Sequence, residues 1–128
     1  MDEKKHWKIF VYTCFGGCAT GVSASKALIR IWEENAEDVK IACLPAAIFP
    51  GKRKEMIKSS DKRLLVDACS LKCGQKLLEK EGVPIDRYIE VTSQLGIKKV
   101  KKLPSKEMEE QVYNAINKEV QEFLRGSF

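Results

Sequence analysis

Five cysteines have the clearest capacity for chemistry in this sequence: Cys14, Cys18, Cys43, Cys69 and Cys73. A thiolate binds metals and acts as a nucleophile. Four thiolates arranged as a tetrahedron, each about 2.3 Å from a central ion, suit zinc, and the same ligand set suits an iron–sulfur cluster. The cysteines therefore predict a metal site or a reactive thiol site, and they leave open which metal is bound.

The cysteines include two pairs with the same spacing of four residues. Cys69 and Cys73 would lie on one face of a helix, one turn apart, if both were helical. Cys14 and Cys18 flank a Gly-Gly turn, in which the backbone can fold tightly around a bound atom. Neither pair has the C-x-x-C spacing of standard zinc fingers, so the positions of the pairs in the fold matter as much as their spacing.

Strands and helices are predicted to alternate along the chain, which is typical of an α/β fold. Hydrophobic, β-branched runs predict strands over 8–13, 39–44, 63–67 and 88–92. Helical periodicity predicts helices over 22–36, 53–58, 71–81 (with Ser70 as N-cap) and 105–125. We expect three layers, with helices on both faces of a mainly parallel four-stranded sheet whose order is 2-1-3-4.

Each cysteine lies at the carboxyl end of a predicted strand or in the loop that follows it. In a parallel sheet these ends share one edge, and ligands bind there at the point where the strand order reverses. Strands 1 and 3 flank that point in the expected order, so we expect the cysteines to converge. The alternative for a single cysteine such as Cys43 is that it is a small buried hydrophobe.

Polar residues beside the cysteines are candidates to support the site. Asp67 ends the third strand, and we expect it either to accept hydrogen bonds from amides of the ligand loop or to cap the following helix. The hydroxyls of Thr13, Thr20 and Ser70 could donate hydrogen bonds to sulfur. The single histidine, His6, precedes the first strand, so we expect it on the surface and not among the ligands.

The composition is that of one domain, which we place at residues 1–128: 44% of the residues are hydrophobic and 32% are charged. No apolar stretch reaches the roughly 18 residues of a membrane-spanning helix, and the polar start is unlike a signal peptide. We therefore expect a cytoplasmic protein without a membrane partner. Since cytosolic thiols stay reduced and the cysteine count is odd, metal or thiol chemistry is favoured over disulfides.

The formal net charge of +5 has its clearest source in the lysine run Lys98, Lys99, Lys101 and Lys102. No aromatic residue is interleaved with these lysines, so we expect a solvated surface segment and no nucleic-acid partner. A phosphate loop after Cys14 is also not expected, because the arginine that closes such loops in low-molecular-weight phosphatases is missing.

Three motifs, at 13–21, 43–46 and 66–73, together resemble the DGC-type family, which is prokaryotic and named after an Asp-Gly-Cys motif. The resemblance covers about residues 10–100 and includes the pattern over 91–97. It implies that zinc is bound by four cysteines, which map onto Cys14, Cys43, Cys69 and Cys73.

The resemblance also includes one match and two departures. Asp67 matches the acid of the family motif, whereas Ala68 stands where the motif has Gly. Cys18 falls where relatives often carry another small residue or place the cysteine one position earlier. It is a fifth ligand, a replacement ligand or a spare reactive thiol.

We expect a zinc-binding protein whose site is structural or holds or senses metal. A closed shell of four thiolates has no open position for water activation, which disfavours hydrolytic catalysis. The alternative is a redox protein that uses an iron–sulfur cluster or cysteine thiol or persulfide chemistry. A third hypothesis is a partner-binding module in which the metal only rigidifies the loops.

Overall fold

The computed structural model describes residues 6–126, in which a four-stranded parallel sheet forms the centre of the molecule. The strands are β1 (Trp7–Thr13), β2 (Val39–Ile41), β3 (Ser60–Asp67) and β4 (Arg87–Glu90). β1 pairs with β2 and β3, and β3 pairs with β4, all in parallel. The order β2-β1-β3-β4 confirms the predicted order 2-1-3-4.

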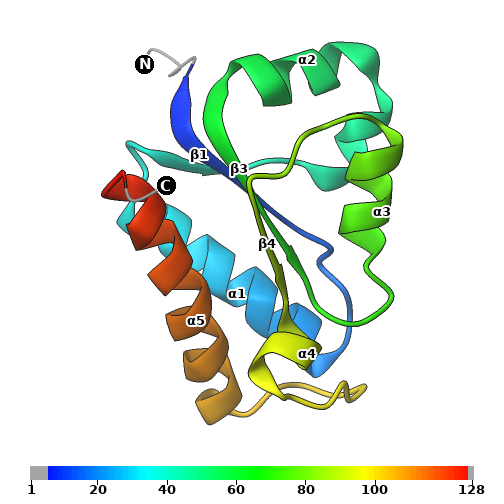
Figure 1. Ribbon diagram of the computed structural model, residues 1–128. Coiled ribbons are helices and arrows are strands. Elements are labelled where there is room, and N and C mark those ends of the chain that lie inside the picture. Colours follow the sequence, from blue (N-terminus) through cyan, green and yellow to red (C-terminus); the bar gives the residue numbers. More distant parts are fainter. Residues whose placement is uncertain (1–5, 127–128) are drawn as a thin grey trace.

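Helices cover both faces of the sheet, which confirms the three predicted layers (Figure 1). α1 (Ala19–Glu34) and α5 (Lys106–Leu124) pack on one face. The 3-10 helix η1 (Leu44–Ile48), α2 (Pro50–Lys58) and α3 (Cys73–Lys80) pack on the other. Within residues 6–126, no helix has the length and apolar character to cross a bilayer.

Alternating side chains of β1 supply both halves of the core. Ile9 and Val11 join the cluster under α1 and α5, whereas Phe10 and Tyr12 join the cluster under α2 and α3. This alternation follows from the two-residue period of a strand. The central strand is therefore buried on both faces, as its apolar sequence requires.

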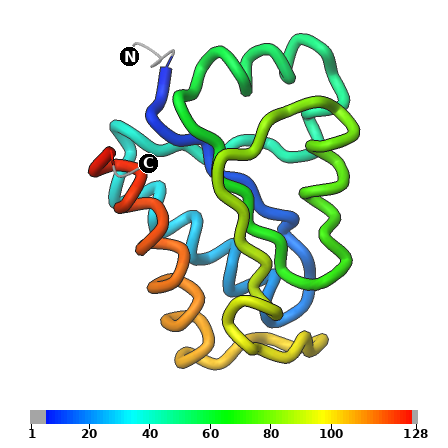
Figure 2. The backbone as a smooth tube through the Cα atoms, in the orientation of Figure 1, coloured from blue at the N-terminus to red at the C-terminus, as the bar shows by residue number. Residues whose placement is uncertain are grey.

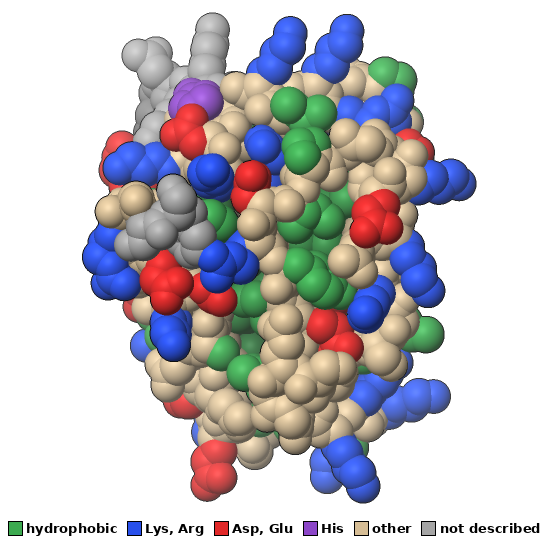
Figure 3. All heavy atoms as spheres, in the orientation of Figure 1, with side chains coloured by type: hydrophobic (Ala, Val, Ile, Leu, Met, Phe, Trp, Pro, Cys, Tyr) green, Lys and Arg blue, Asp and Glu red, His purple; other side chains and the backbone are tan. Residues whose placement is uncertain are grey.

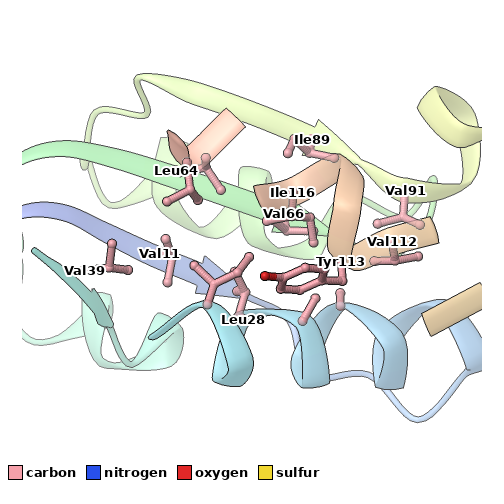
Figure 4. Packing of buried hydrophobic residues seen from close by; sticks show 14 of the residues in the cluster. Val11, Leu28, Val39, Leu64, Val66, Ile89, Val91, Val112, Tyr113 and Ile116 are labelled. Atoms are coloured by element: carbon pink, nitrogen blue, oxygen red, sulfur yellow. The ribbon is translucent and has the colours of Figure 1, made fainter. Parts of the chain in front are cut away.

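The larger cluster joins α1 and α5 to the sheet (Figure 4). Leu28 of α1 and Ile116 of α5 are fully buried in it, and their side chains lie against the sheet residues Val11 and Val66 (Figure 4). Ser105 caps α5 by accepting a hydrogen bond from the Met108 amide at 3.1 Å. The predicted terminal helix is thus confirmed as a core element.

The predicted end of the fourth strand is wrong, because a side-chain cap starts a helix there. The strand ends at Glu90 and not at Thr92. The Glu90 carboxylate accepts hydrogen bonds from the Ser93 amide at 2.9 Å and the Ser93 hydroxyl at 2.7 Å. It thereby caps the short helix α4 (Val91–Leu95), which redirects the chain.

Several other boundaries also differ from those predicted; for example, α1 begins at Ala19 and not at Val22, and β3 begins at Ser60 and not at Arg63. The second strand ends at Ile41 and not at Leu44, and η1 replaces the expected irregular loop. α2 begins at Pro50, whose fixed φ suits the first helical turn. α3 begins at Cys73 and not at Leu71, so Ser70 is not its N-cap.

The buried face of α1 can be tested with two neighbouring residues. Leu28 is 0% exposed, whereas Ile29 is 45% exposed. We expect Leu28→Ala to lower the free energy of unfolding by about 2–5 kcal/mol because it leaves a cavity in the core. The matched control Ile29→Ala should cost about 1 kcal/mol or less. Urea unfolding followed by circular dichroism measures both, and equal losses would contradict this packing.

Candidate metal centre

Among the described residues, Cys14, Cys18, Cys69 and Cys73 line a cavity of about 410 Å³ at the carboxyl edge of the sheet. The first two lie in the loop after β1, and the other two follow β3. Figure 2 shows both loops at the end of the sheet near the yellow segment that precedes α5. Because β1 and β3 flank the reversal of strand order, the cavity lies where such folds bind ligands.

Cys43 lies at the same edge of the sheet but is not among the residues that line this cavity. It follows β2, precedes η1 and is exposed, so the alternative that it is a buried hydrophobe is wrong. Its neighbour Leu44 reaches the start of α3, where a Cβ built on Gly74 would lie 3.3 Å from Leu44 Cδ2. Cys43 is therefore beside the site and outside its cavity.

The loop after β1 depends on a glycine that sequence reasoning did not single out. A Cβ on Gly21 would lie 2.3 Å from the Gly16 carbonyl oxygen, closer than any real contact. The absence of a side chain at Gly21 therefore lets the loop fold back onto the first turn of α1. Gly17 has no such requirement, since a Cβ there would meet nothing within 4 Å.

Cys18 is the cavity cysteine with the most defined surroundings. Its Sγ lies 3.3 Å from the Thr20 hydroxyl, so Thr20 bonds to sulfur as predicted. Burial raises the pKa of the Cys18 thiol, but hydrogen bonds from Thr20 and the Gly21 amide and the charge of Lys99 outweigh it. The net pKa therefore lies below that of an ordinary thiol. Cys18 is disposed toward the thiolate, the form that binds metals.

Asp67 positions the second cysteine loop by capping α3. Its carboxylate accepts hydrogen bonds from the amides of Gly74 and Gln75 at 2.9 and 3.0 Å. These amides directly follow Cys73, so the helix-cap alternative is the one observed. A Cβ on Gly74 would lie 2.8 Å from Asp67 Oδ1, which explains the glycine at that position.

The Asp67 carboxylate has a third partner. The Tyr88 hydroxyl donates to Asp67 Oδ2 at 2.9 Å. Burial, with the hydrogen bond and the charge of Asp67, raises the pKa of the Tyr88 phenol far above its usual range. Tyr88 therefore stays protonated and remains a hydrogen-bond donor to the carboxylate.

The other predicted supporting hydroxyls have no observed bond to sulfur. Thr13 is buried, and its hydroxyl has no hydrogen-bond partner within the part of the chain that the structure describes. Ser70 is exposed in the turn before α3. His6 is exposed as predicted, with its Nε2 atom 2.6 Å from Asp61 Oδ1.

Both cysteine loops contain a left-handed residue next to a cavity cysteine. Phe15 has φ of 50° and Lys72 has φ of 55°, and they are the non-glycine residues with positive φ among residues 6–126. Such conformations cost about 1 kcal/mol or more and persist where the surroundings enforce them. The strained positions in the described backbone therefore adjoin Cys14 and Cys73.

Lys99 and Lys101 also line the cavity, a role that sequence reasoning missed. The lysine run is exposed, as expected, but the Ala19 amide donates a hydrogen bond to the Val100 carbonyl at 2.8 Å. This bond fastens the run to the start of α1. The signal that could have identified it is chain order, because the run follows β4, which ends at the same edge of the sheet.

The donor types at the cavity suit a thiophilic metal, but the sulfurs of residues 6–126 do not form a group that could hold one. No His, Asp or Glu of residues 6–126 lines the cavity, so cysteine sulfur is the available donor. Within the same residues, no three His, Cys, Asp or Glu side chains form a group that could hold a metal ion. Binding at this site would require the two loops to bring their sulfurs together.

The close approach of the first loop to α1 gives a direct test. We expect Gly21→Ala to lower the free energy of unfolding by about 1–3 kcal/mol, because the new methyl group would displace the Gly16 carbonyl. Gly17→Ala is the matched control and should change stability by about 0.5 kcal/mol or less. Urea unfolding of both variants measures the difference, and an equal effect would exclude the role assigned to Gly21.

Comparisons with known proteins identify a family. A family model described as the DGC domain matches residues 10–120, a range that extends beyond the expected 10–100 into α5. The match includes the five cysteines and both cavity loops. A search of curated proteins and a search of solved structures found no match. Because the family model matches most of the chain, this protein belongs to the DGC domain family.

Proposed function

We propose that this protein binds a metal ion, zinc, through the thiolates of its cysteine cavity. The observation that supports this most is that Cys14, Cys18, Cys69 and Cys73, from two loops, line one cavity without a carboxylate or imidazole from the described residues. Zinc is bound well by thiolates, and a closed four-sulfur shell suits a structural or metal-holding site.

The cavity and the family resemblance favour ligand sets that differ in one residue. The cavity supports Cys18 as the fourth ligand, because it lines the same space as the other three and has a lowered thiol pKa. The resemblance implies Cys43, which lies outside that space. We propose the cavity set, with Cys43 as the alternative fourth ligand.

Metal binding at this site would be coupled to the conformation of the two loops. Within residues 6–126 the sulfurs do not form a group that could hold a metal ion, so the free energy of binding would in part draw the loops together. Asp67 holds the start of α3, and Gly21 holds the first loop against α1. These contacts would limit the rearrangement to the loop residues between them.

A second candidate function is thiol chemistry, which the lowered pKa of Cys18 supports. A thiolate in an open cavity attacks disulfides and persulfides more readily than a protonated thiol does. An iron–sulfur cluster, which uses the same sulfur ligands, is the other form of this redox alternative.

Elemental analysis of anaerobically purified protein, with a visible spectrum of the same sample, separates these functions. We expect about one zinc per chain and no visible absorption bands. Iron with sulfide would instead establish a cluster protein. Neither metal, with five titratable thiols, would exclude the zinc proposal and favour thiol chemistry.

Serine variants identify the ligands. We expect Cys69→Ser and Cys73→Ser to lose zinc and to unfold at lower urea, because metal bound only to the native state stabilises it. Cys43→Ser is the matched control and should keep its zinc. Loss of zinc in Cys43→Ser with retention in Cys18→Ser would reverse the choice of fourth ligand. Full zinc content in both Cys69→Ser and Cys73→Ser would exclude this cavity as the metal site.

A further inference from the structure

We infer that the cysteine cavity is also the binding site of a small organic anion, whose carboxylate or similar charged group is bound by Lys99 and Lys101 beside the thiols. This inference does not depend on the metal. It rests on the charge of the cavity lining, on the cavity volume and on the backbone contact that positions the lysines, all within the described residues.

The charged side chains of the described residues that line the cavity are all positive. Lys99 and Lys101 line the cavity, and no Asp or Glu of residues 6–126 does. Neither lysine forms an ion pair within those residues. α1 begins at the same place and has no acidic residue in its first turn, so its positive end adds to the field. The cavity therefore favours a negatively charged occupant.

The cavity is larger than a metal ion requires. Its volume is about 410 Å³, whereas one water molecule takes roughly 30 Å³ and small-molecule pockets take roughly 300–1,000 Å³. Ala68 and Leu71 contribute apolar surface to the lining. An organic anion would place its carbon groups against these residues and its charge near the lysines.

The two lysines are held at the cavity by the backbone. The Ala19 amide donates to the Val100 carbonyl at 2.8 Å, between the two lysines in sequence. All four lysines of the run are exposed, but Lys98 and Lys102 are not among the residues that line the cavity. One run of lysines is thus divided into a pair that faces the thiol cavity and a pair that does not.

Charge-selective alkylation of the full chain, reduced and freed of metal, tests the inference. Iodoacetate is a small carboxylate, and iodoacetamide is its neutral counterpart. In both reactions the sulfur forms a bond to the methylene carbon, the carbon–iodine bond breaks and iodide leaves. Peptide mass spectrometry measures, at each cysteine, the ratio of the rate constant for iodoacetate to that for iodoacetamide.

We expect this ratio to be at least about threefold higher at the cavity cysteines than at Cys43, because the lysines raise the local concentration of the anion. Lys99→Gln with Lys101→Gln should lower it to the Cys43 value. Lys98→Gln with Lys102→Gln removes the same charge and should leave it unchanged. A change in thiol pKa affects both reagents alike and cancels in the ratio.

A second measurement needs no variant. Succinate at constant ionic strength should slow the reaction of iodoacetamide with the cavity cysteines and leave Cys43 unaffected. Equal ratios at all cysteines, or equal effects of the two lysine pairs, would overturn the inference. The alkylation experiment uses protein that has been freed of metal. Absence of zinc from the purified protein would therefore refute the metal proposal without affecting the evidence for anion binding.

Discussion

The parallel pairing of β1 with β3 is the constraint on which the site depends. In this register Thr13 lies opposite Val66, and Asp67 lies opposite Glu90 of β4. The three strands therefore end almost level, and the segments that follow them leave the sheet side by side. The backbone hydrogen bonds of the sheet fix where each strand ends, and the segments that follow must begin there. The two cysteine loops and the lysine run therefore meet at this edge.

Two buried carboxylates at this edge accept hydrogen bonds from backbone amides and do not line the cavity. Asp67 caps α3, and Glu90 caps α4. Burial raises the pKa of the Glu90 carboxyl, but hydrogen bonds from Thr92 and Ser93 outweigh it, so the pKa lies below its usual range and the group stays charged. Charged acceptors at helix N-termini are well satisfied there. As a result, the cavity has thiols and lysines in its lining and no competing acid from the described chain.

The charges that line the cavity are arranged differently from those on the face shown in Figure 3. On the face shown in Figure 3, lysine and arginine side chains are spread over the surface with acidic side chains between them. At the cavity, no acidic side chain of residues 6–126 joins Lys99 and Lys101 in the lining. Thiolates, a metal–thiolate centre and an organic anion all carry negative charge. Two lysines without a carboxylate partner would stabilise each of them.

The sequence by itself determined the architecture, because the signals are local. Strand and helix periodicity predicted the α/β class, and the position of each cysteine after a strand predicted their common edge. The tertiary structure alone decided the composition of the cavity. It separated Cys43 from the other four cysteines and brought in Lys99 and Lys101.

It also showed that Gly21 is needed against Gly16, and that Asp67, and not Ser70, caps α3. These features are contacts between different segments of the chain, and hydrophobic periodicity within a segment does not predict such contacts. Their distances are set by sheet register and by the direction in which each loop leaves its strand. A pattern of residue types does not predict those directions. Only the folded chain therefore revealed which side chains share the site.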